Sequence, residues 1–308
     1  MKRDASHAGS WYTADKDNLN HELDLYFEKA NTSPLQGVRA IIGPHAGFRY
    51  SGPTAAYAYK LVDTTHIKRV FLLGPSHHAY IDGCCLSKCD IYKTPLGNLK
   101  LDKQVIQDLY ETDHFDYMRK NVDEDEHSIE MHLPFTFKIF QDKIEDIKIV
   151  PILVGATSEK QEKLYGDLLA KYLESPENLF IISSDFCHWG SRFDYTYYTK
   201  KKEDKPVFLH SRNQDAVSRP IHESIRELDY QGIQTLEDLS FSKFQAYLKQ
   251  TQNTICGRHP IGVLMAALEI LKDSSKQTIQ CVHYDQSSQC KDVRDSSVSY
   301  ASIYVQIQ

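Results

Sequence analysis

The sequence lacks the features that define several common protein classes. No apolar run approaches the roughly 18 residues that a membrane-spanning helix requires, and the first seven residues (MKRDASH) lack the apolar stretch of a secretory signal. The formal net charge is −6 at pH 7, whereas proteins that bind nucleic acid usually carry an excess of positive charge. We therefore expect an intracellular protein in the cytoplasm, with the nucleus as a second compartment, that neither inserts into a membrane nor binds nucleic acid.

Two common catalytic motifs are also missing. The chain contains no GxSxG sequence, which would form the nucleophile elbow of a serine hydrolase, and no GxxxxGK[ST] phosphate-binding loop. The chain has seven cysteines, but the number is odd and no CxxC pair occurs, which argues against a disulfide framework. Reduced thiols are the preferred interpretation. The alternative is a zinc site at Cys85 and Cys89, whose spacing fits although a second pair is missing.

The remaining composition is that of a globular protein with an α/β fold. Hydrophobic residues make up 41% and charged residues 25% of the sequence, which is ordinary for a globular protein. A length of 308 residues is compatible with one large domain, and we expect a single domain spanning residues 1–308. Strand-like and helix-like patterns alternate along the chain, which indicates a sheet flanked by helices. We expect helices at 15–30, 53–61, 102–112, 158–173, 206–228, 240–250 and 259–272. We expect strands at 38–42, 70–73, 147–154, 179–183, 278–284 and 298–307. The charged run 200–205 is predicted to be a solvated connection before a helix.

Histidines follow two of the apolar strand-like runs. Residues 38–42 lead into His45, and residues 70–73 lead into His77. Ligands of open α/β sheets gather at the carboxyl ends of the strands, so both imidazoles are expected in one crevice. His78 should point to the opposite side of the chain from His77. The alternative for His45 is a hydrogen bond within its own turn.

Residues 125–134 (DEHSIEMHLP) form the densest cluster of groups that could carry chemistry. His127 and Glu130 are three residues apart and would share one face of a helix, which suits a metal site or a histidine oriented by a carboxylate. The alternative is a polar helix start with one buried histidine. The acidic residues just before it, 123–126, are interpreted as an exposed loop, with a cation site as the alternative.

Two further segments carry groups suited to proton transfer or metal binding. Asp185 and His188 follow the apolar strand at 179–183 and could form a proton-transfer pair, whereas a Cys187 nucleophile beside His188 is the weaker interpretation. Cys256 lies just before a predicted helix and near Arg258, which should lower the pKa of its thiol. A buried, inert cysteine is the alternative.

Seven motifs together resemble the Memo family, whose name abbreviates mediator of receptor-kinase-driven cell motility. The resemblance extends from Ser6 to Ala301, and the ordered occurrence of so many motifs makes it specific. The motifs are residues 6–12 (SHAGSWY), 44–47 (PHAG), 74–78 (GPSHH), 123–134 (DEDEHSIEMHLP), 183–190 (SSDFCHWG), 253–262 (NTICGRHPIG) and 295–301 (DSSVSYA).

The resemblance implies a central mixed sheet flanked by helices, similar to class III (LigB-type) extradiol dioxygenases. It also implies a set of site residues. The metal ligands carried over from the family are His45, His77 and Cys256, and the neighbouring pocket residues are His127, Asp185 and His188. His188 matches the acid/base histidine of the dioxygenases. Those enzymes have a glutamate where this chain has Cys256, and this difference disfavours ring cleavage, because a thiolate is a softer ligand.

Three functional hypotheses follow from the resemblance. The first is a protein that binds reduced copper or ferrous iron, with zinc as a third metal, and that influences reactive oxygen balance and cell motility signalling. The second is a non-catalytic adaptor whose crevice binds a phosphotyrosine-bearing peptide or signalling protein through its imidazoles and Arg258. The third is a true dioxygenase that tolerates a cysteine ligand.

Overall fold

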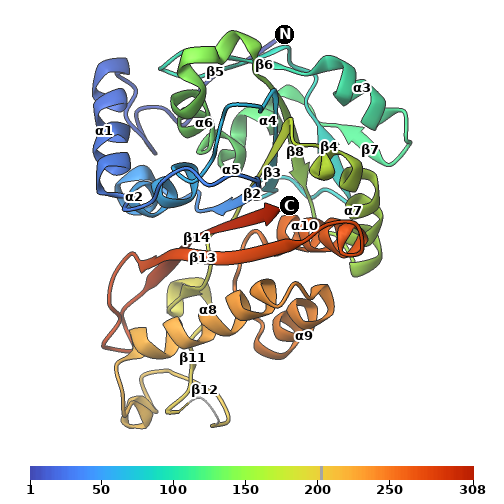
Figure 1. Ribbon diagram of the computed structural model, residues 1–308. Helices are drawn as coiled ribbons and strands as arrows, with labels where there is room; N and C mark the ends of the chain where they lie inside the picture. Colours follow the sequence, from blue (N-terminus) through green and yellow to red (C-terminus); the bar gives the residue numbers. More distant parts are fainter. Residues whose placement is uncertain (202–203) are drawn as a thin grey trace.

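A wide mixed β-sheet forms the middle layer of the protein, seen here in a computed structural model that describes residues 1–201 and 204–308 (Figure 1). Within these residues the sheet contains 12 strands, and its main path runs β1-β5-β6-β8-β3-β9-β2-β14-β10. Outside this path, β13 pairs with β14, and β4 pairs with β7 and β8. The strands are β1 (Lys2–Arg3), β2 (Val38–Gly43), β3 (Arg69–Pro75), β4 (Cys84–Leu86), β5 (Ile91–Lys93), β6 (Asn98–Leu101), β7 (Phe115–Tyr117), β8 (Lys148–Val154), β9 (Asn178–Ser183), β10 (His188–Trp189), β13 (Gln277–Gln286) and β14 (Ser297–Ile307).

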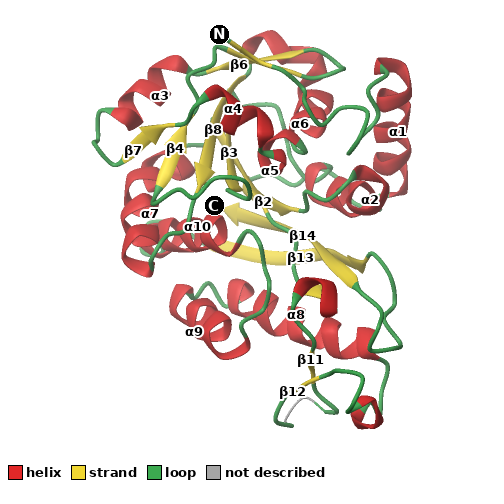
Figure 2. Ribbon diagram, turned by 180° about the vertical axis from the view of Figure 1, so that it is seen from behind, coloured by secondary structure: helices red, strands yellow, loops and turns green. Residues whose placement is uncertain are grey.

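Helices cover both faces of this sheet, so the predicted fold class is confirmed (Figures 1 and 2). Helices α7 and α10 pack against each other and against the central strands on one face, whereas α2, with α1 and α6 beside it, lies on the other. No helix in residues 1–201 and 204–308 combines the length and apolar character needed to cross a membrane. The helices are α1 (Lys16–Lys29), α2 (Phe48–Tyr59), α3 (Lys103–Tyr110), α4 (Lys120–Asp125), α5 (His127–Glu130), α6 (Leu133–Phe140), α7 (Glu159–Glu174), α8 (Ile221–Glu237), α9 (Phe241–Thr251) and α10 (Arg258–Leu271).

The central strands β8, β3, β9 and β2 are parallel and almost entirely buried. Their apolar runs are continuous because each strand is covered on both faces, which is the pattern expected of buried parallel strands. All six predicted strands are present, with bounds shifted by one or two residues. Parallel pairing also brings the carboxyl ends of β3, β9 and β2 to one edge of the sheet, where the candidate residues follow.

Two helix predictions are wrong in their bounds. The helix predicted at 206–228 begins only at Ile221 (α8), because Pro220 forms its N-cap and disfavours helical geometry at the residue before it. Residues 207–208 instead form β12 (Val207–Phe208), which pairs with β11 (Tyr197–Tyr198). The helix predicted at 53–61 begins earlier, at Phe48, and therefore contains Pro53 within it. Of the charged run 200–205, Lys202 and Glu203 lie outside the described residues.

Candidate metal centre

The centre lies at the carboxyl ends of three neighbouring strands. The sheet order β3-β9-β2 sets the ends of these strands side by side, and His77, Asp185 and His45 each follow by two residues. The chain leaves each strand there, so these side chains lie close together. The backbone N–H of His45 donates a hydrogen bond of 2.8 Å to Asp185 Oδ1, which joins two of the strand ends directly. The expectation that His45 and His77 come together is confirmed, and the space between these strand ends is called the crevice below.

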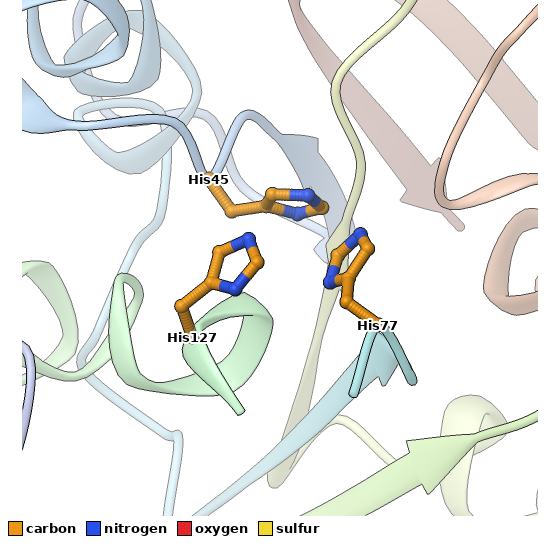
Figure 3. Close-up of side chains that lie close together, drawn as sticks. All are labelled: His45, His77 and His127. Atoms are coloured by element: carbon orange, nitrogen blue, oxygen red, sulfur yellow. The ribbon is translucent and has the colours of Figure 1, made fainter. Parts of the chain in front are cut away.

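Three imidazoles face one another across this crevice (Figure 3). The ring centroids of His45 and His77 are 5.1 Å apart, and His127, at the start of α5, lies 4.5 Å from His77 and 5.4 Å from His45. One nitrogen of each ring lies within 4.8 Å of one nitrogen of the other two. This spacing is close enough for three imidazoles to share one cation.

Hydrogen bonds outside the crevice determine which ring nitrogen carries the proton. His45 Nδ1 lies 2.6 Å from Ser183 Oγ, whose own proton is donated to the carbonyl of Ser128 at 2.7 Å. The serine oxygen must therefore accept from His45, so His45 Nδ1 is protonated and Nε2 carries the lone pair. His77 Nδ1 similarly donates to Glu126 Oε1 at 2.9 Å. In both histidines the Nε2 lone pair is left free to bind a metal, an orientation typical of metal-ligating histidines.

Cys256 also contacts His45. Its Sγ is 3.1 Å from His45 Nε2 and accepts a hydrogen bond of 3.2 Å from the backbone N–H of Asp185. Ligand atoms of His45, Asp185 and Cys256 all lie within 4.8 Å of one another. Because His45 Nε2 carries a lone pair, it can accept the thiol proton, and the carbonyl of Asp185, 3.5 Å from the sulfur, is a second acceptor. A cation that bound both atoms would displace this proton.

The predicted low pKa of the Cys256 thiol is wrong. Burial raises its pKa well above the usual value, and the nearby carboxylate of Asp185 adds to the effect. The charge of Arg258 and the backbone N–H groups of Asp185 and Gly257 act in the opposite direction but do not offset burial. The position before α10 is thus too poorly solvated for a free thiolate.

Within the described residues, the potential metal ligands form two overlapping groups rather than the single predicted triad. One group is His45, His77 and His127, and the other is His45, Asp185 and Cys256. His45 belongs to both. The set of His45, His77 and Cys256 does not occur as one group within the same distance limit, and its joint role as ligands stays a prediction.

Burial disfavours the charged forms of His45 and His127. It lowers the pKa of His45 well below its usual value, and the neighbouring imidazoles of His77 and His127 lower it further. Burial, with His77 as the next cause, lowers the pKa of His127 to about 3. The Nδ1 atom of His127 is buried and has no hydrogen-bond partner. Such an unpaired nitrogen is costly unless a ligand satisfies it.

In the described residues, Asp185 and His188 make their hydrogen bonds to other partners. Asp185 accepts from the backbone of His45, whereas His188 Nδ1 lies 3.0 Å from the carbonyl of Phe186 and 3.1 Å from that of Thr254. His188 Nδ1 therefore carries the proton, and its Nε2 is the basic nitrogen. Burial raises the pKa of Asp185, and the nearby His188 opposes this effect. A role of the two residues in proton transfer stays a prediction.

The acidic segment 123–126 is not the exposed loop that was predicted. Asp123 and Glu126 are buried, and Arg3 donates hydrogen bonds to the carboxylate of Asp123 and to the backbone carbonyl of Glu126. The Glu126 carboxylate holds both Nδ1 and the backbone N–H of His77. Glu126 could not be recognised from the sequence as a site residue, since its partner His77 lies 49 positions away.

Glu130 also faces away from the imidazole it was expected to orient. Its carboxylate accepts hydrogen bonds from Arg3 (2.7 Å), His7 Nδ1 (2.9 Å) and Tyr12 Oη (2.8 Å). It therefore anchors the N-terminal segment behind the crevice rather than His127.

Replacing Glu130 with glutamine should produce a pH-dependent loss of stability. Burial alone would raise the pKa of Glu130, but the hydrogen bond from His7 and the charge of Arg3 lower it from 4.5 to about 2. A carboxyl group whose pKa is lower in the folded state stabilises the fold above pH 4.5, and this contribution is lost as the pH falls toward 2. The free-energy difference between wild type and Glu130→Gln should shrink by about 3 kcal/mol across this range. Urea denaturation at several pH values measures it, and a pH-independent difference would contradict the assignment.

The other cysteines take no part in this centre. All seven cysteines are free thiols, as predicted. Cys85 and Cys89 occur in neither group of potential metal ligands in the described part of the chain. Cys187 is fully buried, and burial raises the pKa of its thiol well above the usual value, which disfavours a role as nucleophile.

Known proteins resemble this chain over almost its whole length. The model of the Memo-like protein family matches residues 3–304. Protein MEMO1 of Xenopus tropicalis is 50% identical over 301 residues, which cover 97% of this chain and 96% of that protein. Protein MEMO1 of Homo sapiens is 46% identical with the same coverage. The memo-1 homolog of Caenorhabditis elegans is 45% identical over 303 residues, covering 97% of this chain and 81% of that protein.

A solved structure of the uncharacterized protein JW3007 from Escherichia coli K12 is a much weaker match. It aligns with a TM-score of 0.44 and 12% identity, covering 85% of this chain and 99% of that one. This likeness is too low to support any inference about the site.

Proposed function

This chain belongs to the Memo-like protein family, and on that premise we propose that it binds reduced copper or ferrous iron at the centre around His45. The observation that carries the proposal is the 3.1 Å approach of Cys256 Sγ to His45 Nε2, where two donor atoms converge on one point. Imidazole and thiolate together suit reduced copper and ferrous iron, and zinc is a third candidate.

The donor types suit such an ion. His45, His77 and Cys256 would hold it, because the Nδ1 atoms of both imidazoles are engaged elsewhere and the sulfur is the soft donor. His77 and Cys256 would have to move closer together to share it, since they do not fall in one group of potential ligands among the described residues. His127 offers a further nitrogen donor, since one of its ring nitrogens lies within 4.8 Å of nitrogens of His45 and His77. A bound copper or iron ion would supply one-electron redox chemistry. The basic Nε2 of His188 would accept or release protons beside it.

The family suggests a wider role for this chemistry. We propose that the centre influences reactive oxygen balance in the cytoplasm and, through it, cell motility signalling. Ring cleavage of catechol-like substrates is not expected, since Cys256 replaces the glutamate of the dioxygenases with a softer ligand.

A second candidate is an adaptor that binds a phosphotyrosine-bearing peptide through its imidazoles and Arg258. The exposed guanidinium of Arg258, two residues after Cys256 at the start of α10, is the observation in its favour, because guanidinium groups bind phosphate in a bidentate manner. The adaptor would bind its peptide equally well without metal, which separates the two candidates.

Anaerobic titration of the full chain with reduced copper and with ferrous iron tests the main proposal. We expect one equivalent of at least one metal to bind tightly enough to compete with a chromogenic chelator. If neither metal binds at a defined stoichiometry, the proposal is wrong. Saturable binding of a phosphotyrosine peptide to the metal-free protein would then favour the adaptor.

Replacing Glu126 with glutamine should weaken metal binding by roughly 10- to 100-fold, the usual effect of losing a partner that orients a metal-bound histidine. Glutamine preserves the size of the side chain but cannot provide the carboxylate that accepts from His77 Nδ1. The half-buried Glu124, two positions earlier on the chain, pairs with Lys120 rather than with a histidine, and Glu124→Gln is the matched control. Equal affinities of the two variants would show that Glu126 does not orient a ligand.

A further inference from the structure

A fully buried carboxylate in α8 is held by uncharged hydrogen-bond donors. Asp229 lies in the middle of this helix, which packs against β13 and α9 (Figure 1). Its Oδ1 accepts from the backbone N–H of Cys187 at 3.1 Å and from Asn253 Nδ2 at 3.0 Å. Its Oδ2 accepts from Tyr284 Oη at 2.8 Å. These three bonds compensate for the hydration that the carboxylate loses on burial.

The two donors on Oδ1 come from the two segments that carry residues of the candidate metal centre. Cys187 directly precedes His188, and Asn253 lies three residues before Cys256. One oxygen of Asp229 therefore joins the segment that follows β9 to the segment that precedes α10.

The same two segments are also joined directly, beside the residues that Asp229 holds. The backbone N–H of His188 donates to Thr254 Oγ1 at 2.7 Å, and Thr254 Oγ1 donates to the carbonyl of His188 at 3.0 Å. The backbone N–H of Asp185 donates to Cys256 Sγ at 3.2 Å. Site residues keep their geometry only when surrounding hydrogen bonds hold their backbone in place. Asp229 provides such support at both segments at once.

Asp229 is also a group whose charge changes near neutral pH. Burial raises its pKa from 3.8 to about 6, against the effect of the hydrogen bonds that it accepts. Nearby titratable side chains whose pKa values burial raises, and which are therefore uncharged at neutral pH, are Tyr195, Tyr247, Tyr284 and Cys187. The exposed guanidinium of Arg226, on the same helix, lies over the Tyr284 ring at 5.7 Å. A protonated Asp229 accepts hydrogen bonds more weakly, because a charged acceptor forms the stronger bonds.

We propose that Asp229 is a positioning residue for the metal centre, whose carboxylate holds the segments of His188 and Cys256 together and whose protonation loosens them. This inference rests on the proposed metal-binding function. By linkage, metal binding and release of the Asp229 proton favour each other. Metal affinity therefore falls as the pH drops through about 6, in addition to the loss caused by protons that compete for the ligands themselves.

Asp229→Asn is uncharged at every pH and tests the proposal by anaerobic competition between the full chain and a chromogenic chelator, with reduced copper and with ferrous iron. We expect the variant to bind roughly tenfold more weakly than wild type at about pH 7.5. The two affinities should converge as the pH falls to about 5, because wild-type Asp229 is then protonated as well. Their ratio cancels the protons that compete for the shared ligands. A ratio of one throughout, or a ratio that does not change with pH, would overturn the proposal.

Two further variants keep this test decisive. Asp238→Asn, at the exposed end of the same helix, is the control and should retain wild-type affinity at each pH. Tyr284→Phe removes one donor from the Asp229 carboxylate and keeps the ring. It should shift the loss of affinity to a higher pH, because the charged form loses a hydrogen bond. This shift tests the proposal even if Asp229→Asn does not fold, and its absence would contradict the proposal.

A measurement without metal separates this inference from the proposed function. In the metal-free protein, Cys256 should react with iodoacetamide several times faster in Asp229→Asn than in wild type or in Asp238→Asn, because its segment opens more readily. The mass of the Cys256 peptide reports the reaction. Equal rates would overturn the inference. Faster reaction in the variant, together with no metal binding by wild type, would support the positioning of Cys256 and overturn only the proposed function.

Discussion

Replacing Cys256 with serine is expected to weaken the binding of reduced copper by on the order of a hundredfold or more. This exceeds the loss expected when a residue that only hydrogen-bonds to a metal ligand is replaced. The thiolate is the softest donor in the crevice, and a serine hydroxyl is a poor ligand for reduced copper. The fold should survive, because a hydroxyl can still accept the hydrogen bond that the backbone N–H of Asp185 donates to the sulfur. Anaerobic competition with a chromogenic chelator measures the change.

Cys281 provides the matched control for this substitution. It is a half-buried free thiol in β13 and belongs to neither group of potential metal ligands among the described residues. Cys281→Ser should therefore retain wild-type affinity. If both variants bind copper as tightly as wild type, Cys256 is not a ligand, and the three imidazoles of His45, His77 and His127 become the preferred site.

The two groups of potential ligands also separate the candidate metals. A metal that prefers nitrogen should depend mainly on His127, whereas one that prefers sulfur should depend mainly on Cys256. His45 belongs to both groups and is required in either case. The pattern of loss in single variants therefore distinguishes the groups without any knowledge of which metal is resident.

The placement of His45, His77 and Asp185 could be predicted from sequence because it depends on local patterns. Each follows a continuously apolar run, and such runs become neighbouring buried strands whose ends meet at one edge of the sheet. The family motifs added Cys256 and His127, which no strand pattern would have brought into the same crevice.

The supporting contacts could not be predicted because they depend on tertiary packing. Glu126 reaches His77 across 49 positions, and Arg3 reaches Glu130 across 127. The high pKa of the Cys256 thiol likewise depends on how deeply the fold buries it, whereas the sequence showed only the adjacent helix start and Arg258. Burial therefore changes the pKa of this thiol more than the nearby positive charge does.

Replacing Arg3 with methionine is expected to lower the free energy of unfolding by about 3–5 kcal/mol, the cost of breaking a buried ion pair from one side. The side chain is 1% exposed, and its guanidinium donates to Asp123 Oδ1 at 3.1 Å, to Glu130 Oε2 at 2.7 Å and to the carbonyl of Glu126 at 2.9 Å. Methionine approximates the length of the arginine stem, so the loss reports the missing charge and hydrogen bonds more than a cavity. Two buried carboxylates would be left without their cation.

Arg294 is the control, because it forms an ion pair with Asp292 at the surface and its side chain is 86% exposed. Arg294→Met should therefore leave the unfolding curve unchanged. Equilibrium denaturation in urea compares the two variants. Equal stabilities would show that the buried cluster around Arg3 contributes nothing to the stability of the fold.

Replacing Arg3 should also affect the crevice, since Arg3 donates a hydrogen bond to the backbone carbonyl of Glu126, whose carboxylate orients His77. Arg3→Met should therefore weaken metal binding even under conditions in which the variant remains fully folded.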